Sequence, residues 1–281
     1  MLRSLIASHV RRGALKVLRR LNVGDVTIRH HYTNDPFRLH FFKHRGYWYH
    51  GKRREQETMA AFAKLLKSGN LVVEVGGHIG YMSVYFAHLV GPQGRVVVFE
   101  PGPNNLPYLI VNTKKYPNVQ VVPDALTDFT GSATLYTEEL SGQNNSLLDQ
   151  YTVFEANMRE ASLGEIERGR VTVGCTTLDR FIDSKHQGMP SFVKIDVEGA
   201  ELSVLRGMKN CLEAGNVALM VEVTQNHLAV YDLLSRAGFS VFDAHGRHIK
   251  NAAAMAFNVF CLKDDDERLP AFRSDFGSGV G

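Results

Sequence analysis

Acidic residues gather after the apolar run at residues 192–195, where Asp196, Glu198 and Glu201 stand close together in the chain. Such a run is typical of a buried strand, and open α/β sheets place their reacting groups at the carboxyl ends of strands. Lys194 shares the strand face of Asp196, so the two side chains could form an ion pair. Crowded carboxylates repel one another, which can raise one pKa and create a general base. We expect Asp196 to be that base.

Lys194, Glu198 and Glu201 complete the predicted catalytic group, in which the two glutamates orient the substrate or hold a charged end of the cofactor. A structural alternative exists for both glutamates. Glu201 favours a helix N-terminus by its charge, and Glu198 could simply occupy a turn.

A second group of residues surrounds the turn after the apolar run at residues 71–75. It consists of Glu74, Gly76, Gly77, His78 and Gly80. Glycines let the backbone turn sharply and let a ligand approach the main chain, although they also close many purely structural turns. Glu100 ends the next apolar run, twenty residues beyond Gly80, where a carboxylate can accept both hydroxyls of a ribose. The pairing indicates an adenosine-containing cofactor.

The details of this turn favour S-adenosylmethionine over a dinucleotide. A dinucleotide fingerprint reads G-x-G-x-x-G, whereas the third and sixth places counted from Gly76 are His78 and Tyr81. Glu74 would repel a diphosphate, yet it could pair with the ammonium group of a methionine moiety.

Several stretches resemble known methyltransferase motifs. Residues 74–80 are similar to the acid-x-Gly-x-x-x-Gly motif of class I S-adenosylmethionine methyltransferases, and residues 99–101, Phe-Glu-Pro, resemble their second motif. Residues 123–128, followed by Gly131 and Leu135, resemble the "A-L-S-D…G…L" segment of the FkbM family. Residues 193–201 are similar almost letter for letter to that family's "K-I-D-V-E-G-A-E" signature.

The resemblance spans about residues 70–262 and implies roles for individual residues. Glu100 would hold the ribose, and Asp124 or Ala125 would border the adenine, with an ordinary role in the turn as the alternative for Asp124. His78 departs from the family, which often has a small amide there. The implied substrate-binding residues are Asn144, Asn145, Ser146 and Glu222. No ligand spacing indicates a metal, so none is expected.

Short apolar runs alternate with helical patterns from residue 71 onward, which predicts a doubly wound, Rossmann-like α/β fold with a seven-stranded, mostly parallel sheet. The predicted strands are residues 71–75, 96–99, 119–122, 192–195, 217–223, 239–242 and 256–261. The predicted helices are residues 81–89, 105–115, 178–182, 201–208 and 227–237.

The expected domains are a basic N-terminal extension at 1–54, a methyltransferase domain at 55–262 and a frayed tail at 263–281. Residues 1–54 contain 13 Lys and Arg but only two acidic residues, Asp25 and Asp35. The rest of the chain contains 19 basic and 27 acidic residues, from totals of 32 and 29. Residues 2–21 read as a basic amphipathic helical extension. That helix could lie on an anionic membrane, act as a transit peptide, or pack on the domain.

The polar stretch at residues 137–170 interrupts the alternating pattern after a predicted hairpin strand at 133–136. We interpret it as a substrate loop or lid, with disorder as the alternative. The three widely spaced cysteines encode neither a disulfide framework nor a zinc site, which fits a cytoplasmic protein. Membrane association through residues 1–21 is the alternative left open.

The predicted function is O-methylation of a hydroxyl on a sugar, glycan or secondary metabolite, with S-adenosylmethionine as cofactor. One alternative is N-methylation of nucleic acid or protein, although amine-methylating enzymes on nucleobases often read Asn/Asp-Pro-Pro-Tyr where this chain reads Asp196-Val-Glu-Gly. We expect no nucleic-acid partner. A second alternative is an adaptor at a membrane surface that binds the cofactor without turnover.

Overall fold

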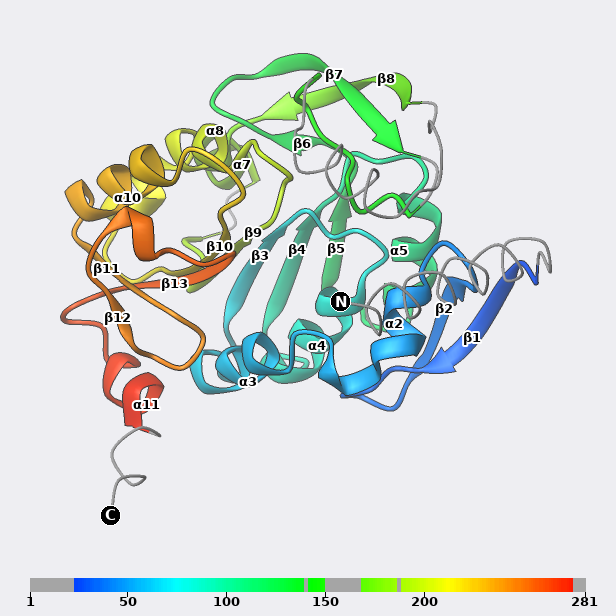
Figure 1. The fold of residues 1–281 in the computed structure, drawn as a ribbon, viewed down its shortest axis with the longest axis horizontal. Coiled ribbons are helices and arrows are strands. Elements are labelled where there is room, and N and C mark those ends of the chain that lie inside the picture. The colour runs from blue at the N-terminus through cyan, green and yellow to red at the C-terminus, as the bar shows by residue number, and fades with distance from the viewer. Residues whose placement is uncertain (1–22, 139–140, 150–167, 186–187, 275–281) are drawn as a thin grey trace, which may run out of the picture.

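The computed structural model describes residues 23–138, 141–149, 168–185 and 188–274. Its centre is an eight-stranded sheet in the order β12-β11-β13-β10-β9-β3-β4-β5 (Figure 1). The strands in that order are β12 His248–Ile249, β11 Phe239–Phe242, β13 Asn258–Lys263, β10 Ala218–Glu222, β9 Phe192–Ile195, β3 Leu71–Val75, β4 Arg95–Phe99 and β5 Val119–Val122. All seven predicted strands are present. The two-residue β12, which pairs with β11, makes the count one higher than the sequence predicted.

Strands β10, β9, β3, β4 and β5 run parallel, and β13 lies antiparallel between β10 and β11. Successive side chains of a strand point to opposite faces. In β4, Val96 and Val98 enter one buried cluster while Val97 and Phe99 enter the other. The sheet therefore divides two hydrophobic cores, which confirms the predicted doubly wound α/β fold.

Helices cover both faces of the sheet (Figure 1). Those on the first face are α3 Gln56–Leu65, α4 Tyr81–Val90 and α5 Leu106–Thr113. Those on the second face are α7 Leu178–Lys185, α8 Glu201–Arg206, α9 Lys209–Glu213 and α10 His227–Arg236. Phe62 of α3 and Phe86 of α4 are fully buried on the first face, and Phe181 and Leu205 are buried on the second.

The stretch before α3 belongs to the first core. It forms the antiparallel hairpin of β1 (Asp25–Arg29) and β2 (Pro36–His40), then α2 (Arg45–His50) and the short helix η1 (Gly51–Arg53). Phe37, Leu39 and Tyr47 are buried in the cluster that contains Phe62. The domain therefore extends before the expected boundary at residue 55, because these apolar side chains complete its core. The amphipathic helix predicted at residues 2–21 lies outside the described residues.

The described part of the expected tail is also packed. Helix α11 (Leu269–Arg273) buries Phe272 completely, 5.5 Å from the ring of Phe260 and 6.1 Å from that of Phe242 between centroids. Buried Arg268 donates to the carbonyls of Ser191 and Asn216. Aromatic burial therefore holds the chain as far as this helix.

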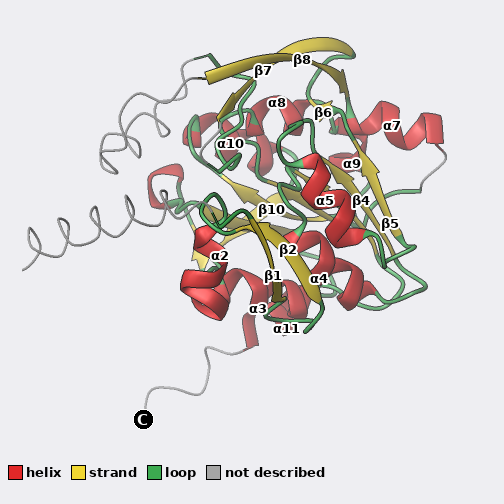
Figure 2. Cartoon of the chain, turned by 90° about the vertical axis from the view of Figure 1, so that its right-hand side faces the viewer, coloured by secondary structure: helices red, strands yellow, loops and turns green. Residues whose placement is uncertain are grey.

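A small three-stranded sheet follows β5. Strand β8 (Arg168–Thr176) pairs with β6 (Ala125–Leu126) on one side and β7 (Gly131–Glu138) on the other. The predicted strand at 133–136 is the middle of β7. Figures 1 and 2 show this small sheet at the top of the view, above the central sheet, and Ser146 bridges back to Tyr136. Residues 139–140 and 150–167 of the predicted lid lie outside the described chain. No helix among the described residues is long and apolar enough to cross a membrane.

Candidate active site

A cavity of about 310 Å³ lies at the carboxyl ends of β3, β4, β9 and β10, which is where open α/β sheets bind ligands. The predicted site residues that line it are Glu74, Gly76, Gly77, His78, Glu100, Asp124, Ala125, Asn144, Asn145, Lys194, Asp196, Glu198 and Glu222. Gly80, Ser146 and Glu201 are not among the lining residues. Residues far apart in the sequence thus meet around one space.

The glycines of the turn after β3 are required by contacts within the protein. A Cβ on Gly76 would lie 1.8 Å from the backbone oxygen of Asp196, and one on Gly77 would lie 2.2 Å from a methyl of Val98. Gly80 has φ +87° and packs against Leu109 of α5. The turn is therefore pressed against β9, β4 and α5, and Gly80 serves this packing rather than the cavity wall.

Glu100 is held at the end of β4 by donors on both carboxylate oxygens. Oε2 accepts from the backbone N–H of His78 at 2.7 Å, and Oε1 accepts from the N–H of Gly102 at 2.8 Å and from the Asn105 amide at 3.2 Å. A carboxylate has about four acceptor sites, so three donors leave capacity for a ligand hydroxyl. Burial raises the pKa of Glu100 to about 7.

His78 connects two walls of the cavity. Its Nε2 lies 3.0 Å from the carbonyl oxygen of Ser141, and its Nδ1 lies 3.0 Å from the hydroxyl of Tyr47. A carbonyl can only accept, so Nε2 carries the hydrogen and Nδ1 accepts from the tyrosine. Burial lowers the pKa of His78 to about 4, so the ring is neutral near pH 7. The imidazole thus ties α2 to the loop after β7, which a small amide would be too short to do.

Lys194 lies at the centre of the buried charges. Its Nζ donates to the carbonyl of Gly76 at 2.8 Å and lies 3.0 Å from Asp196 Oδ2, so the ion pair that the sequence suggested is present. Glu74 Oε1 is 3.5 Å from the same nitrogen. Glu74 therefore pairs with the ammonium of Lys194, whereas the sequence suggested a pair with the ammonium of the cofactor. Burial opposes the charge of Lys194, but Asp196 and Glu74 raise its pKa above the usual range.

Glu74 itself is almost fully enclosed at the end of β3. Its second oxygen accepts a hydrogen bond from the hydroxyl of Ser83 at 2.5 Å. Burial raises the pKa of Glu74 to about 7, while Lys194 acts in the opposite direction.

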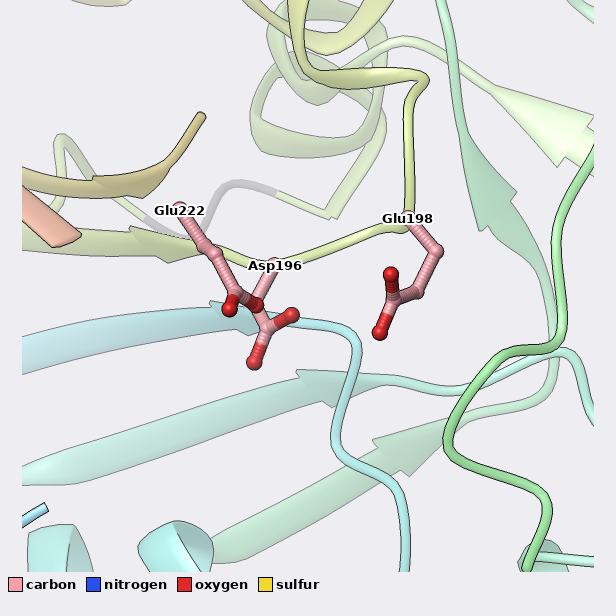
Figure 3. A group of neighbouring side chains, drawn as sticks. All are labelled: Asp196, Glu198 and Glu222. Atoms are coloured by element: carbon pink, nitrogen blue, oxygen red, sulfur yellow. The ribbon is translucent and has the colours of Figure 1, made fainter. Parts of the chain in front are cut away.

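Asp196, Glu198 and Glu222 bring carboxylate oxygens within 4.8 Å of one another (Figure 3). The charge of Asp196 and burial raise the pKa of Glu222 to about 11. Burial alone would raise the pKa of Asp196, but Lys194 and the hydrogen bond from Glu222 lower it. Near pH 7 Glu222 therefore holds the proton and donates to Asp196. Carboxylate repulsion does raise one pKa, but on Glu222 rather than on the expected base.

The three carboxylates together form a set of oxygen ligands that a hard divalent cation would accept. The sequence did not indicate this set, because Glu222 comes from the neighbouring strand β10. The Lys194 ammonium, 3.0 Å from Asp196, already supplies a positive charge beside it.

Glu201 and Ser146 support the turn that carries Glu198. Glu201 Oε1 accepts from the N–H of Gly199 at 2.8 Å and from the hydroxyl of Thr224 at 3.1 Å. Ser146 donates to the carbonyl of Glu198 at 2.7 Å. The expectation of a catalytic Glu201 is therefore not met, because its carboxylate is buried at the start of α8 and faces the turn. The structural alternative describes it better.

Sequence reasoning missed the part of the wall that precedes α3, which includes Tyr47, Arg54 and Glu55. The Arg54 guanidinium carbon lies 4.6 Å from the centroid of the Tyr47 ring. The aromatic run at residues 47–49, directly before the basic residues 52–54, was the available indication.

Two curated relatives match part of the chain. Hexuronic acid methyltransferase AglP of Haloferax volcanii is 26% identical over 189 residues, which cover 67% of this chain and 71% of the relative. Methyltransferase 1 of Beauveria bassiana is 28% identical over 154 residues, which cover 50% of this chain and 58% of that protein.

Among solved structures, methyltransferase FkbM from Methylobacillus flagellatus KT aligns with a TM-score of 0.45 at 16% identity. The alignment covers 71% of this chain and about half of that protein, 48%. The family model described as the methyltransferase FkbM domain matches residues 74–241, more than half of the chain. This match confirms the predicted family and, with it, S-adenosylmethionine as the cofactor. The chain belongs to the FkbM methyltransferase family.

Proposed function

We propose that this methyltransferase transfers the methyl group of S-adenosylmethionine to a hydroxyl of a sugar, glycan or secondary metabolite, with Asp196 as the general base. The observation that carries this proposal is the position of Asp196. It lines the cavity with its side chain 27% exposed, while its partner Lys194 is 3% exposed beneath it. A carboxylate held ionised at the cavity wall can accept the proton of a bound hydroxyl.

The lowered pKa of Asp196 keeps its carboxylate ionised at neutral pH, at the cost of making it a weaker base than an ordinary aspartate. The hydroxyl oxygen gains positive charge as it forms its bond to the methyl carbon, so its proton becomes acidic during the reaction. A base that is fully ionised at neutral pH can take that proton even when its own pKa is low. Lys194 keeps Asp196 charged, and Glu222 donates a hydrogen bond that holds the carboxylate in place.

Residues at the β4 side of the cavity fit the adenosine portion of the cofactor. Glu100 has remaining acceptor capacity for a ribose hydroxyl, and Asp124 and Ala125 lie on the adjoining wall. When bound, S-adenosylmethionine supplies an electrophilic sulfonium methyl. Holding the acceptor oxygen in line with that methyl supplies much of the acceleration.

The loop after β7 supplies candidate contacts for a polyhydroxylated acceptor. Asn145 is committed to the fold, since its oxygen accepts from the N–H of Glu138 at 3.0 Å and its amide donates to Asn104 at 2.8 Å. The Asn144 side chain forms no hydrogen bond with the described residues, and it lines the cavity. We propose that Asn144 binds the acceptor, while Asn145 and Ser146 position the loop. The relative that acts on hexuronic acid supports a sugar acceptor.

A transfer assay tests the proposal. Purified protein is incubated with labelled S-adenosylmethionine and a panel of sugars and glycans, and methylated product is quantified. We expect Asp196→Asn to reduce transfer by at least about a hundredfold, within the range for loss of a general base, while affinity for S-adenosylhomocysteine stays within about threefold.

Asp183→Asn is the matched control, because Asp183 is an exposed aspartate of α7 that does not line the cavity. It should retain full transfer. An Asp196→Asn protein as active as this control would refute the assignment of the base.

A further inference from the structure

Two cationic residues, Arg54 and Lys194, line the cavity within the described part of the chain. The Lys194 ammonium has three donors, and Gly76 O, Asp196 Oδ2 and Glu74 Oε1 lie 2.8, 3.0 and 3.5 Å from it. Its donors are therefore directed at the protein itself. Arg54 is the cation with capacity to bind a ligand.

The Arg54 guanidinium is held in place without being saturated. It stacks on Tyr47, and its Nε lies 3.5 Å from Glu55 Oε1. Its side chain is only 25% exposed, yet it forms no hydrogen bond with the residues that the structure describes. A guanidinium has five donors, so those on the two Nη atoms remain available.

Gly46 of α2 leaves room for this arrangement. A Cβ at that position would lie 2.8 Å from Arg54 Nη1, so the guanidinium would have to move from its present place. The Tyr47 ring and the Glu55 carboxylate therefore hold the Arg54 guanidinium at the wall of the cavity, in the space that Gly46 leaves. Such fixing reduces the entropy lost when a guanidinium binds a planar anion.

The rest of the charged lining is acidic. It comprises Glu55, Glu74, Glu100, Asp124, Asp196, Glu198 and Glu222. Glu222 is protonated near pH 7, and the other carboxylates of this wall would repel a ligand carboxylate. Such a ligand would be attracted to Arg54, whose planar guanidinium matches carboxylate geometry.

We propose that Arg54 binds a carboxylate of the ligand in this cavity. The inference rests on the proposed function, since it takes the cavity as the place where cofactor and acceptor meet. Two ligands of that reaction can supply the carboxylate: the methionine moiety of the cofactor, and an acidic sugar of the uronic acid class as acceptor. The chemistry at Arg54 is the same in both cases.

The test compares Arg54→Met with wild type in calorimetric titrations. S-adenosylhomocysteine carries the methionine carboxylate, whereas 5′-methylthioadenosine lacks it. Glucuronate and glucose form a second pair, added to protein saturated with S-adenosylhomocysteine and followed by saturation-transfer NMR. Arg45→Met is the matched control, because Arg45 also stacks on an aromatic ring, that of Phe42, but does not line the cavity.

For a cofactor carboxylate, we expect Arg54→Met to weaken S-adenosylhomocysteine binding by about ten- to a hundredfold and to leave methylthioadenosine binding unchanged. For an acceptor carboxylate, S-adenosylhomocysteine binding stays the same and the wild-type preference for glucuronate over glucose disappears. Arg54→Lys should bind with an affinity between those of Arg54→Met and wild type, because lysine keeps the positive charge but lacks the planar guanidinium.

The inference is overturned if Arg54→Met binds both pairs of ligands with the same affinities and preference as wild type. It is also overturned if methylthioadenosine affinity falls as far as that of S-adenosylhomocysteine, because the residue would then only support the fold of the cavity. None of these titrations needs turnover. Failure of the proposed function would appear separately, as wild-type protein that binds the cofactor and methylates no hydroxyl.

Discussion

The Lys194 ammonium lies 3.0 Å from the Asp196 carboxylate, although the lysine is enclosed in the protein and the aspartate opens into the cavity. The two residues are two positions apart at the end of β9, so their side chains point to the same face of the sheet. The lysine also bonds to the glycine turn after β3. The buried Lys194 therefore keeps the proposed base charged and also holds the glycine turn after β3 in position.

Removing this cation should destabilise the fold. Lys194→Met leaves Glu74 and Asp196 without their shared partner, and loss of one member of a buried ion pair typically costs about 3–5 kcal/mol. We expect a decrease of that order in the free energy of unfolding, measured by urea denaturation at pH 7.5. Lys209→Met, which disrupts an exposed pair with Glu213, should change it by less than about 0.5 kcal/mol. Equal effects of both substitutions would contradict the central role of Lys194.

Glu100 should make stability depend on pH in a defined direction. Its pKa is about 7 in the folded protein against an ordinary value of 4.5, so the folded state binds its proton more tightly than the unfolded state does. The stability this proton confers is present below about pH 4.5 and is lost as the pH rises through 7.

Glu100→Gln removes that titration, so the variant should gain roughly 1–3 kcal/mol relative to wild type between pH 5 and pH 8. Urea midpoints at the two pH values measure the difference. Glu267→Gln, at an 83% exposed side chain, serves as control. A gap between wild type and Glu100→Gln that stays constant with pH would show that Glu100 titrates normally.

Glu222 should tolerate an amide where Asp196 does not. Its pKa of about 11 keeps it protonated across the neutral range, and glutamine also donates a hydrogen bond. We expect Glu222→Gln to retain methyl transfer within about threefold at pH 7.5, and Glu222→Ala to lose about tenfold or more as Asp196 loses its support. Initial rates with a saturating acceptor compare the three proteins. A Glu222→Gln variant as inactive as Asp196→Asn would mean that an ionised Glu222 is required.

His78→Asn tests the connection between α2 and the loop after β7. Asparagine tolerates the φ of 47° at this position, so the substitution removes the bonds of the ring without straining the backbone. We expect faster amide hydrogen exchange at residues 141–145, with a loss of global stability of about 1–2 kcal/mol. Tyr47→Phe removes one of the two bonds and should have a smaller effect in the same direction. Unchanged exchange in His78→Asn would show that the loop is held by other contacts.

The sequence predicted the parts of this site that depend on local pattern. Apolar runs located the strands, and strand alternation placed Lys194 beside Asp196. The pairing of Glu100 with the glycine turn also follows from spacing, because both belong to consecutive parallel strands.

Contacts that depend on strand order or distant packing could not be read in this way. Glu222 reaches Asp196 because β10 pairs with β9 in a register that places Val221 opposite Ile195. The short spacing from Asp196 to Glu201 does not reveal that Glu198 has φ 52° and that the chain reverses there, which turns Glu201 away from the cavity. Arg54 was assigned to the basic N-terminal extension, because its contact with the site requires the burial of Phe37, Leu39 and Tyr47.

Calorimetric titration with S-adenosylhomocysteine, run in parallel on wild type and Glu100→Ala, tests most directly whether this cavity is the cofactor site. The account predicts micromolar binding to wild type and a loss of at least about tenfold when the carboxylate is removed. Wild-type protein that does not bind, or a Glu100→Ala variant that binds equally well, would contradict it.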